Sequence, residues 1–392
     1  MKVTMISNYI NHHQIPFSNE LFQRLGEDYK FIQTEPMEEE RVKMGWGIKE
    51  EEIPYLLYLE KEEDYCKQLI GESDILLIGW NEREDLFVNR LNSNKLTIRI
   101  SERIYREGQW KAISPRGLIR KYKEHTRYRK KSVYLLCAGA YVASDFSLVK
   151  AYPDKMFRFG YFPEFIEYSK EVLRENHPWG KEPKEREIQI VWAGRFIPLK
   201  HPEYAIRLAE SLKKQGYYFH LHMIGGGELE DKLQQEVREK KLEKEVTFYG
   251  FLKPGQVREI MEKCHIHLFT SNHLEGWGAV VNEAMNCGCV EVVNDQVGAA
   301  PFLIKQGKNG LMYQGGSYED MEEKVIYLLN HPKEGSRMSE EAYRTIETQW
   351  NAKEAVKRLL TFYEQWKKES IQCPEEGPFS KAPIIPVVRR KK

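Results

Sequence analysis

The sequence has no run of apolar residues that approaches the 18 or more needed for a membrane-spanning helix. Its first residues, MKVTMISNYINHHQ, become polar too early for the apolar core of a signal peptide. Hydrophobic residues make up 41% of the chain and charged residues 30%, a balance that excludes a disordered chain. We therefore expect a folded cytoplasmic protein, with association at the inner face of the cell membrane left open.

Cysteines are few, and their spacing excludes the common cysteine-based sites. None of the six forms a C-x-x-C pair or a spacing that assembles structural zinc. Cys287 and Cys289 form the one close pair, and packing in a helix-to-strand turn explains it better than redox chemistry. We expect reduced thiols and no cysteine-bound metal.

The chain also lacks a strong net charge, because its formal charge is only +1. One local exception is Arg116–Lys131, where eight bases stand against Glu124 alone. Leu118, Ile119, Tyr122 and Thr126 fall near one face of a predicted helix there. Such a helix suits an anionic membrane surface or an anionic acceptor, and the alternative is a solvated charged face. No nucleic-acid module accompanies the stretch, so we expect no nucleic-acid partner.

Short apolar runs alternate with helical patterns, which is typical of β-α units and parallel sheets. A length of 392 residues suggests two or three domains of about 150 residues. In the first half, the predicted strands are Val3–Ser7, Tyr29–Gln33, Ile75–Gly79, Leu96–Ile100, Tyr141–Ala143 and Met156–Tyr161. A charged segment with Pro178 and Pro183 then fits a linker, which places the predicted boundary near residue 180.

The β-α pattern restarts in the second half of the chain. Its predicted strands are Ile188–Ala193, Phe219–Ile224, Val246–Tyr249, Ile266–Thr270 and Val290–Val293. The fold class is therefore α/β, with two Rossmann-like domains. Ligands of such sheets bind beyond the carboxyl ends of the strands, so two facing domains would form a cleft lined by their loops.

Two glycine-containing loops follow predicted strands of the second half. In VWAGRFIPLKHPEYAI, Gly194 permits a close turn, and Arg195 and Lys200 precede a helix, where cations and backbone N–H groups together favour a diphosphate. Taken alone, the two cations could equally be a surface charge pair. Gly225, Gly226 and Gly227 mark a tight turn or a close approach to a ligand. Phe251 could offer an apolar face to a nucleobase, with core packing as the alternative.

The segment SNHLEGWGAVVNEAMNCG carries two carboxylates eight positions apart. Glu275 lies in a glycine-flanked loop, and Glu283 lies in the predicted helix that follows. Eight helical residues span roughly 12 Å, so the two carboxylates can contact different parts of an extended ligand. Carboxylates accept hydrogen bonds from hydroxyls, as on a ribose and a hexose, and the helix N-terminus near Gly276–Gly278 adds unpaired N–H groups.

These residues together form the pattern G-R-F-x-x-x-K, G-G-G-E and E-G-W-G-x-x-x-N-E-A-M. The pattern resembles the nucleotide-binding half of family-4 retaining glycosyltransferases of GT-B fold (glycosyl transferases group 1), over roughly residues 188–315. The resemblance implies that Arg195 and Lys200 bind the donor diphosphate and Glu283 the ribose. It also implies that Glu275, with its neighbouring backbone, binds the transferred sugar. The implied donor-binding residues are Gly194, Gly226, Gly227, Phe251, Gly276, Trp277, Gly278 and Glu283.

The resemblance further implies domain roles and a mechanism. Residues 1–180 would bind the acceptor, 181–350 the nucleotide sugar, and 351–370 would form a helix that crosses back to the first domain. Retention would follow from front-face attack assisted by the departing phosphate oxygen. No metal-binding D-x-D occurs near these residues, so we expect no metal and no cofactor, with the nucleotide sugar as co-substrate.

The first half offers weaker candidates for acceptor binding. Relatives often carry His-Asp after the fourth strand of this domain, whereas this chain has Glu102 and Arg103, for which a surface ion pair is the alternative. His13 follows the first strand and could equally cap a helix or be solvated. Trp80 and Asn81 end another strand, where a ring can stack on a sugar and an amide can bind its hydroxyls. The proline-rich tail, residues 371–392, is predicted to be flexible.

The sequence thus predicts an enzyme: a hexosyltransferase or related transferase of bacterial polysaccharide or envelope glycan synthesis, peripheral to the membrane. We expect a UDP-sugar donor and a saccharide or lipid-linked acceptor. Two alternatives remain. A non-hydrolysing nucleotide-sugar epimerase also uses two Rossmann-like domains, and a non-catalytic subunit would bind the donor without releasing nucleoside diphosphate.

Overall fold

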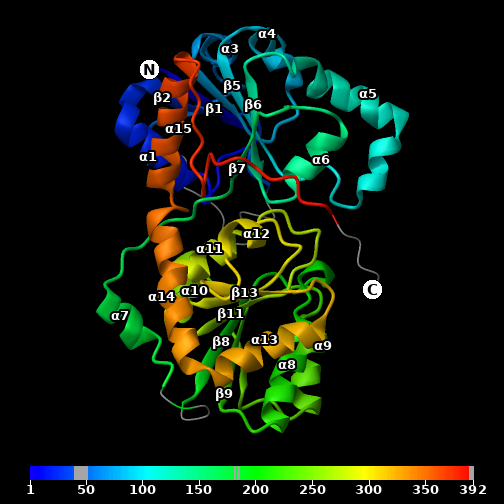
Figure 1. Ribbon diagram of the computed structural model, residues 1–392, viewed down its shortest axis with the longest axis vertical. Coiled ribbons are helices and arrows are strands. Elements are labelled where there is room, and N and C mark those ends of the chain that lie inside the picture. The colour runs from blue at the N-terminus through cyan, green and yellow to red at the C-terminus, as the bar shows by residue number, and fades with distance from the viewer. Residues whose placement is uncertain (39–51, 181, 183–185, 388–392) are drawn as a thin grey trace. The chain divides into compact units, whose positions relative to one another are not determined.

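The computed structural model describes residues 1–38, 52–180, 182 and 186–387 (Figure 1). The chain forms two compact units. Among the described residues, the first contains Met1–Glu164 and residues 351–387, and the second contains Phe165–Trp350. The first break therefore comes earlier than the predicted position near residue 180. The reason is that Ile166 exchanges two backbone hydrogen bonds of 2.9 Å with the Asn286 side chain, which ties this segment to the second unit.

The first unit is built on a parallel sheet of seven strands, in the order β3-β2-β1-β4-β5-β6-β7. Its inner strands are buried along nearly their whole length, as expected when helices cover both faces of a parallel sheet. The strands are β1 (Val3–Ser7), β2 (Tyr29–Gln33), β3 (Leu56–Tyr58), β4 (Ile75–Ile78), β5 (Leu96–Ser101), β6 (Val133–Ala138) and β7 (Met156–Phe159).

The second unit repeats this architecture with six parallel strands, in the order β10-β9-β8-β11-β12-β13. Strands β8 and β9 pair over six residues, from Ile188 opposite Phe219 to Ala193 opposite Ile224. The strands are β8 (Ile188–Ala193), β9 (Phe219–Ile224), β10 (Val246–Phe248), β11 (Ile266–Phe269), β12 (Val290–Asn294) and β13 (Gly310–Tyr313). Two Rossmann-like units are thus present, as the sequence predicted.

Helices connect the parallel strands. In the part of the chain that the structure describes, no helix is long and apolar enough to cross a membrane. In the first unit the helices are α1 (Ile15–Leu25), α3 (Glu63–Glu72), α4 (Val88–Asn92), α5 (Pro115–Glu124), α6 (Val142–Leu148) and α15 (Ala352–Lys367). In the second unit they are α7 (Lys170–Asn176), α8 (Glu203–Lys214), α9 (Glu230–Glu239), α10 (Pro254–Met261), α11 (Ala279–Asn286), α12 (Ala300–Leu303), α13 (Tyr318–Asn330) and α14 (Pro332–Thr348).

One predicted strand is wrong, and three strands, β3, β6 and β13, went unnoticed. Residues 141–143, expected to be a strand, lie at the start of helix α6, while the sheet takes the preceding segment VYLLCA as β6. Gly139, with φ of 135°, ends β6 in a conformation that suits glycine, and the chain can then turn into the helix. The short edge strands β3 and β13 are too brief to stand out by periodicity alone.

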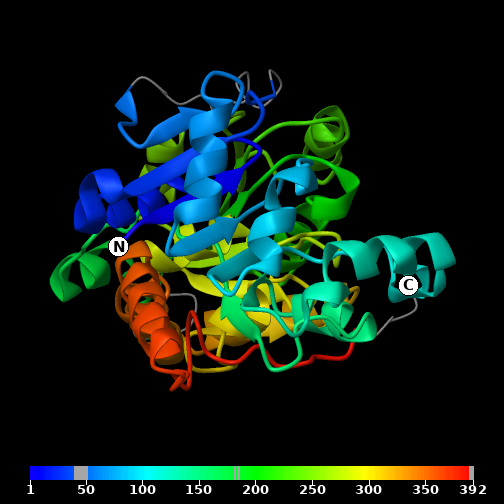
Figure 2. The same cartoon turned by 90° about the horizontal axis from the view of Figure 1, so that it is seen from above.

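The C-terminal part of the chain belongs to the first unit. Helix α15 packs against α1, and the two lie side by side in Figures 1 and 2. The expectation of a flexible tail is wrong for residues 379–382. Phe379 and Ala382 donate backbone hydrogen bonds to Arg158 and Met156, at 2.9 and 3.1 Å, and Arg158 donates one of 2.7 Å to Ser380. The tail is thereby attached to strand β7.

Phe379 provides a test of this attachment. Its side chain is 2% exposed, and its ring lies 5.6 Å from that of Phe362 on α15 and 6.0 Å from that of Phe159 on β7. We predict that Phe379→Ala lowers the free energy of unfolding by about 3 kcal/mol, because it leaves a cavity between the helix and the sheet. Chemical denaturation measures the change.

The matched control is Ile384→Ala in the same tail, where the side chain is 59% exposed. It should change the free energy of unfolding by less than about 0.5 kcal/mol. Equal effects of the two substitutions would mean that Phe379 does not anchor the tail.

Candidate functional site

In the second unit, the order in which strands are added to the sheet reverses at β8, and we call this point the strand reversal. From β8 the chain first builds β9 and β10 on one side and then returns to place β11 on the other side. The loops after β8 and β11 therefore diverge at the carboxyl edge of the sheet, which is where open α/β sheets form ligand crevices. The segments carrying Arg195, Lys200 and Glu275 follow these two strands.

Glycines let the loops after β8 and β9 pack backbone against backbone. The Cβ atom of any other residue at Gly225 would lie 1.9 Å from the carbonyl oxygen of Gly194, and φ at Gly225 is +124°. Phe196 donates a backbone hydrogen bond of 2.8 Å to Gly226, and a Cβ atom at Gly227 would lie 2.7 Å from the oxygen of Phe196. This contact holds the predicted phosphate-binding segment in one place.

Lys200 and Glu275 meet across the strand reversal. The Lys200 ammonium donates a hydrogen bond to the Glu275 carboxylate, and both side chains are mostly buried, at 15% and 16% exposure. Lys200 lies at the end of a short 3-10 helix, η7 (Pro198–Lys200), and its backbone oxygen accepts a hydrogen bond of 2.5 Å from the Thr270 hydroxyl. Asn272, at the start of the Glu275 loop, donates to the Leu199 oxygen at 2.9 Å. The structure thus brings two predicted site residues from distant segments together.

Two further candidates remain accessible to a ligand. Arg195 directly follows Gly194 and is exposed. Phe251, in the loop after β10, is 60% exposed, and its ring lies 2.8 Å from the position of a Cβ atom at Gly226. A larger residue at position 226 would displace this ring. An exposed aromatic face beside glycine backbone suits a planar ligand such as a nucleobase.

Trp277 does not offer its side chain to a ligand. The side chain is 1% exposed, its indole nitrogen donates a hydrogen bond of 2.8 Å to Asn282, and its ring lies 5.6 Å from that of Trp350. Among the predicted donor-binding residues it can therefore contribute only backbone. Its packing fixes the turn at Gly276 and Gly278, and Gly278 caps helix α11 with φ of 88°.

Glu283 lies in the middle of α11 and keeps partial exposure. Burial of its carboxyl raises the pKa to about 7, although nearby Arg258 and His267 act in the opposite direction. A carboxyl with a pKa near neutrality changes its hydrogen-bonding capacity within the physiological pH range. Glu283 is thus a carboxyl whose charge changes near neutral pH.

A buried pair that sequence reasoning missed lies in the same sheet. His267 on β11 and Glu291 on β12 face each other in register, and His267 Nδ1 lies 2.8 and 2.9 Å from the two carboxylate oxygens. Neither side chain is exposed, and burial raises the pKa of Glu291. In the sequence, His267 lies between apolar residues, and nothing there indicates Glu291 as its partner. Only the pairing of β11 with β12 brings the two side chains together.

In the first unit, two of the residues predicted to bind the acceptor, His13 and Glu102, contact the same tyrosine. The His13 ring stacks on Tyr161, with 5.9 Å between ring centroids, and the Tyr161 hydroxyl donates a hydrogen bond of 2.7 Å to Glu102. Glu102 also pairs with Arg106. Tyr161 follows β7 and was not among the predicted residues. His13, Tyr161 and Glu102 therefore form a polar cluster after three different strands.

The remaining acceptor candidates differ among themselves. Trp80 is 72% exposed, which leaves its ring free to stack. Asn81 uses its side chain locally, donating to the Gly79 oxygen and accepting from the Arg83 backbone, both at 3.0 Å. The structure contradicts an acceptor role for Arg103, because its guanidinium is 4% exposed and forms an ion pair with buried Asp145 at 3.1 Å.

The predicted basic helix corresponds to α5, which Ser114 caps, and to a 3-10 turn, η6 (Thr126–Tyr128). No residue of α5 is buried. Leu118, Ile119 and Tyr122 are 40%, 58% and 58% exposed. Thr126 does not share this face, because its hydroxyl donates a hydrogen bond of 2.8 Å to the Val149 oxygen.

The close packing at Gly225 can be tested by substitution. Gly225→Ala should lower the free energy of unfolding by more than about 2 kcal/mol, because the methyl group collides with the Gly194 carbonyl in a backbone conformation that disfavours alanine. It should also weaken nucleotide binding, measured by calorimetry. The control is Gly255→Ala, where a Cβ atom meets nothing within 4 Å. Unchanged stability and binding in Gly225→Ala would contradict the packing described.

Parts of the chain are similar to known proteins. Residues 174–345 match the family model for glycosyl transferases group 1. The chain is 25% identical over 169 residues to the poly(ribitol-phosphate) alpha-N-acetylglucosaminyltransferase of Staphylococcus aureus, which covers 43% of this chain and 34% of that protein. It is 24% identical over 233 residues to the poly(glycerol-phosphate) alpha-glucosyltransferase of Bacillus subtilis, which covers 58% of this chain and 33% of that protein. The matches thus span about a third of each relative.

Solved structures share the fold. Anabaena HepE in complex with UDP matches with a TM-score of 0.65 at 14% identity, over 92% of this chain and 100% of that one. The lipopolysaccharide outer core galactosyltransferase WaaB matches with a TM-score of 0.63 at 17% identity, over 94% of this chain and 100% of that one. The predicted GT-B type of fold is thereby confirmed. Residues 174–345, which match the model of the glycosyl transferases group 1 family, contain the Lys200–Glu275 pair.

Proposed function

We propose that the protein is a retaining glycosyltransferase that moves a sugar from a UDP-sugar to a saccharide or lipid-linked acceptor. The observation that carries this proposal is the Lys200–Glu275 pair at the strand reversal of the second unit. It joins a cation suited to a diphosphate with a carboxylate suited to sugar hydroxyls. Exposed Arg195 would supply the second cation, and Phe251 an apolar face for the base.

Polysaccharide or envelope glycan synthesis is the proposed setting. Two relatives are named for transfer to poly(ribitol-phosphate) and poly(glycerol-phosphate), and a structural neighbour was solved with UDP. The proposed reaction breaks the bond between the sugar and the diphosphate and forms a new bond to an acceptor hydroxyl. The proton of that hydroxyl passes to the departing phosphate oxygen.

Within this mechanism the protein stabilises charge on the leaving group. Lys200 and Arg195 would neutralise the diphosphate, and the N-terminus of α11 would add backbone N–H donors. Glu275 would orient the hexose through its hydroxyls. We propose that the reaction is metal-independent, because two side-chain cations occupy the role that a metal ion has in other transferases.

We also propose that α5 contacts an anionic membrane surface from the cytoplasmic side. Its exposed apolar side chains, Leu118, Ile119 and Tyr122, alternate with exposed cations such as Arg116 and Lys123. Such a helix can lie in a membrane interface, with its cations near lipid phosphates.

The test follows release of nucleoside diphosphate from a panel of nucleotide sugars, with and without bacterial lipid extract and EDTA. We predict acceptor-dependent release that survives EDTA, and a loss of at least about a hundredfold in Glu275→Ala. The control is Glu243→Ala, at an exposed site in the same unit, which should retain wild-type rates. Sugar interconversion without release would instead identify an epimerase, and donor binding without turnover a non-catalytic subunit.

Glu283 leads to a pH prediction. If its carboxylate accepts hydrogen bonds from the ribose hydroxyls, the deprotonated form binds nucleotide more tightly. With a pKa of about 7, this form dominates above neutrality and is lost as the pH falls. We predict that the dissociation constant for UDP rises about tenfold between pH 8 and pH 6. Titration calorimetry at a series of pH values measures it.

The comparison variant is Glu283→Gln, which has the same shape and no titrating proton. Its affinity should be weaker at pH 8 and nearly constant over the same range. A wild-type affinity that does not change with pH, or a Gln variant with the same slope, would remove Glu283 from the ribose site.

A further inference from the structure

The first unit contains a pocket at the edge of its sheet opposite to the acceptor candidates. It has a volume of about 550 Å³, and its wall includes the turn before β6, the loop before β7, and the tail at Ile384. His13, Trp80 and Glu102 all follow strands, whereas the turn and the loop that line the pocket precede strands. Since the sheet is parallel and β6 has six residues, the two edges lie roughly 20 Å apart.

Basic and apolar side chains together line the pocket. Arg129, Lys130 and Lys150 line it together with a single carboxylate, Asp154. All three cations are exposed, and none has an ion-pair partner within the described part of the chain. The other lining residues are mainly apolar: Ala151, Pro153, Met156 and Ile384, with Ser147 beside them.

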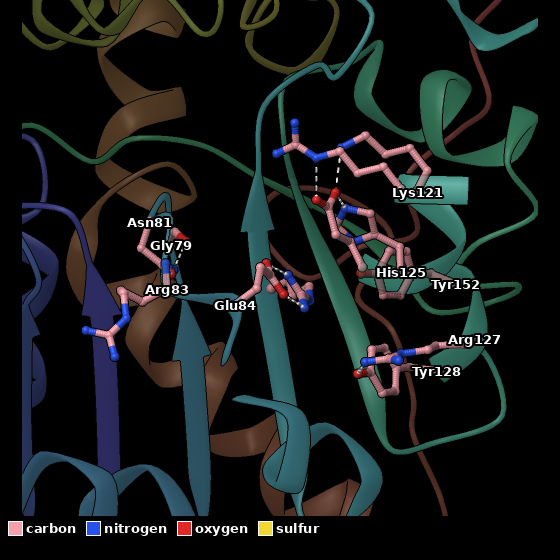
Figure 3. A network of polar contacts seen from close by, with 12 residues as sticks. Gly79, Asn81, Arg83, Glu84, Lys121, His125, Arg127, Tyr128 and Tyr152 are labelled. Carbon is pink, nitrogen blue, oxygen red and sulfur yellow. Dashed lines mark hydrogen bonds and ion pairs between the residues drawn. The ribbon is translucent and has the colours of Figure 1, made fainter. Parts of the chain in front are cut away.

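Hydrogen bonds hold the two basic segments against each other. Figure 3 shows His125 beside Tyr152, where Nδ1 and the hydroxyl lie 2.7 Å apart. Burial lowers the pKa of His125 well below its ordinary value and raises the pKa of Tyr152, so this contact joins two uncharged groups. The Lys155 ammonium donates to the oxygens of Arg129 and Lys131, at 3.1 and 2.6 Å. These bonds connect the turn after η6 with the loop before β7.

The loop before β7 also stores backbone strain. Lys150, Tyr152 and Asp154 have φ of 52°, 52° and 57°, which places three non-glycine residues in the left-handed region. Such conformations cost free energy and persist only where surrounding contacts impose them, often at ligand-binding loops. These three residues alternate in direction along the loop. Lys150 and Asp154 lie in the pocket wall, and Tyr152 between them is fully buried in the core.

We propose that this pocket binds the phosphate headgroup of an anionic membrane lipid, with Arg129, Lys130 and Lys150 around the phosphate. Three cations against one carboxylate favour an anion, and the apolar lining favours an amphiphile over a free ion. The neighbouring surface agrees: Leu148 at the end of α6 and Ile384 in the tail are 48% and 59% exposed. The inference rests on the membrane contact proposed for α5 and deepens it by naming a specific headgroup site.

The experiment uses the full chain and vesicles of phosphatidylcholine with or without phosphatidylglycerol. Three triple variants are compared. The pocket variant is Arg129→Ala, Lys130→Ala and Lys150→Asn, where asparagine tolerates the left-handed backbone. The α5 variant removes Arg116, Arg120 and Lys123 by alanine, and the remote control removes the exposed Lys353, Lys357 and Lys368 of the α15 region in the same way.

The wild type should float with vesicles that contain phosphatidylglycerol and not with pure phosphatidylcholine. The pocket variant should bind them about a hundredfold more weakly, and the α15 variant should stay within about threefold of the wild type. Soluble glycerol 3-phosphate should bind the wild type and not the pocket variant. UDP affinity and thermal unfolding check that each variant is folded, and Lys150→Asn alone, with about a fivefold loss, serves if the triple variant does not fold.

Three other results would overturn the proposal, and each would show which part of it is wrong. If only the α5 variant loses vesicle binding, the membrane contact stands and the pocket does not take part. If the wild type ignores anionic vesicles, both membrane proposals fail, while the transferase assay with a soluble acceptor still decides the catalytic one. If the pocket variant keeps vesicle binding but loses binding to soluble poly(glycerol phosphate), the pocket serves an anionic polymer instead.

Discussion

The parallel register of the two sheets is the constraint from which the sites follow. Every strand that the structure describes runs in the same direction as its sheet neighbours, so the loops after strands gather at one edge and the loops before strands at the other. The predicted donor-binding segments of the second unit follow strands β8, β9, β10 and β11, so they begin in the first kind of loop. The basic pocket, built by Arg129 and Lys150, occupies the second kind. Within the first unit, the basic pocket and the acceptor candidates His13, Trp80 and Glu102 thereby lie at opposite edges of one sheet.

At the motif edge, geometry is fixed by backbone contact. Gly225 and Gly227 allow the loops after β8 and β9 to approach more closely than side chains permit. This explains why glycines and charged residues occur together in the sequence: the glycines set the distance at which Arg195 and Lys200 are presented. The charges alone, on a loosely packed loop, would lose more conformational entropy on binding a ligand.

How far the sequence predicts this molecule depends on the range of the interactions involved. The bounds of β1 and β8 follow from short, mainly apolar segments, VTMIS and IQIVWA, and the loop positions of Lys200 and Glu275 follow from the β-α order. Their contact needs the strand order, which periodicity does not give. The side-chain direction of Trp277 and the anchoring of Phe379 depend on packing partners far away in the chain, so the motif and the proline-rich composition were misleading there.

Two ion pairs show how a structural charge differs from one that suits a ligand. Asp145 accepts four hydrogen bonds, two from Arg103 and one each from the Tyr105 backbone and Gln109, so its carboxylate is saturated. Glu275 has Lys200 as its one side-chain donor within the described residues, and both groups retain partial exposure. A mostly buried pair contributes little net stability, since desolvation offsets attraction. The unused acceptor sites of Glu275 therefore argue for a role beyond folding, toward a hydroxyl-bearing ligand.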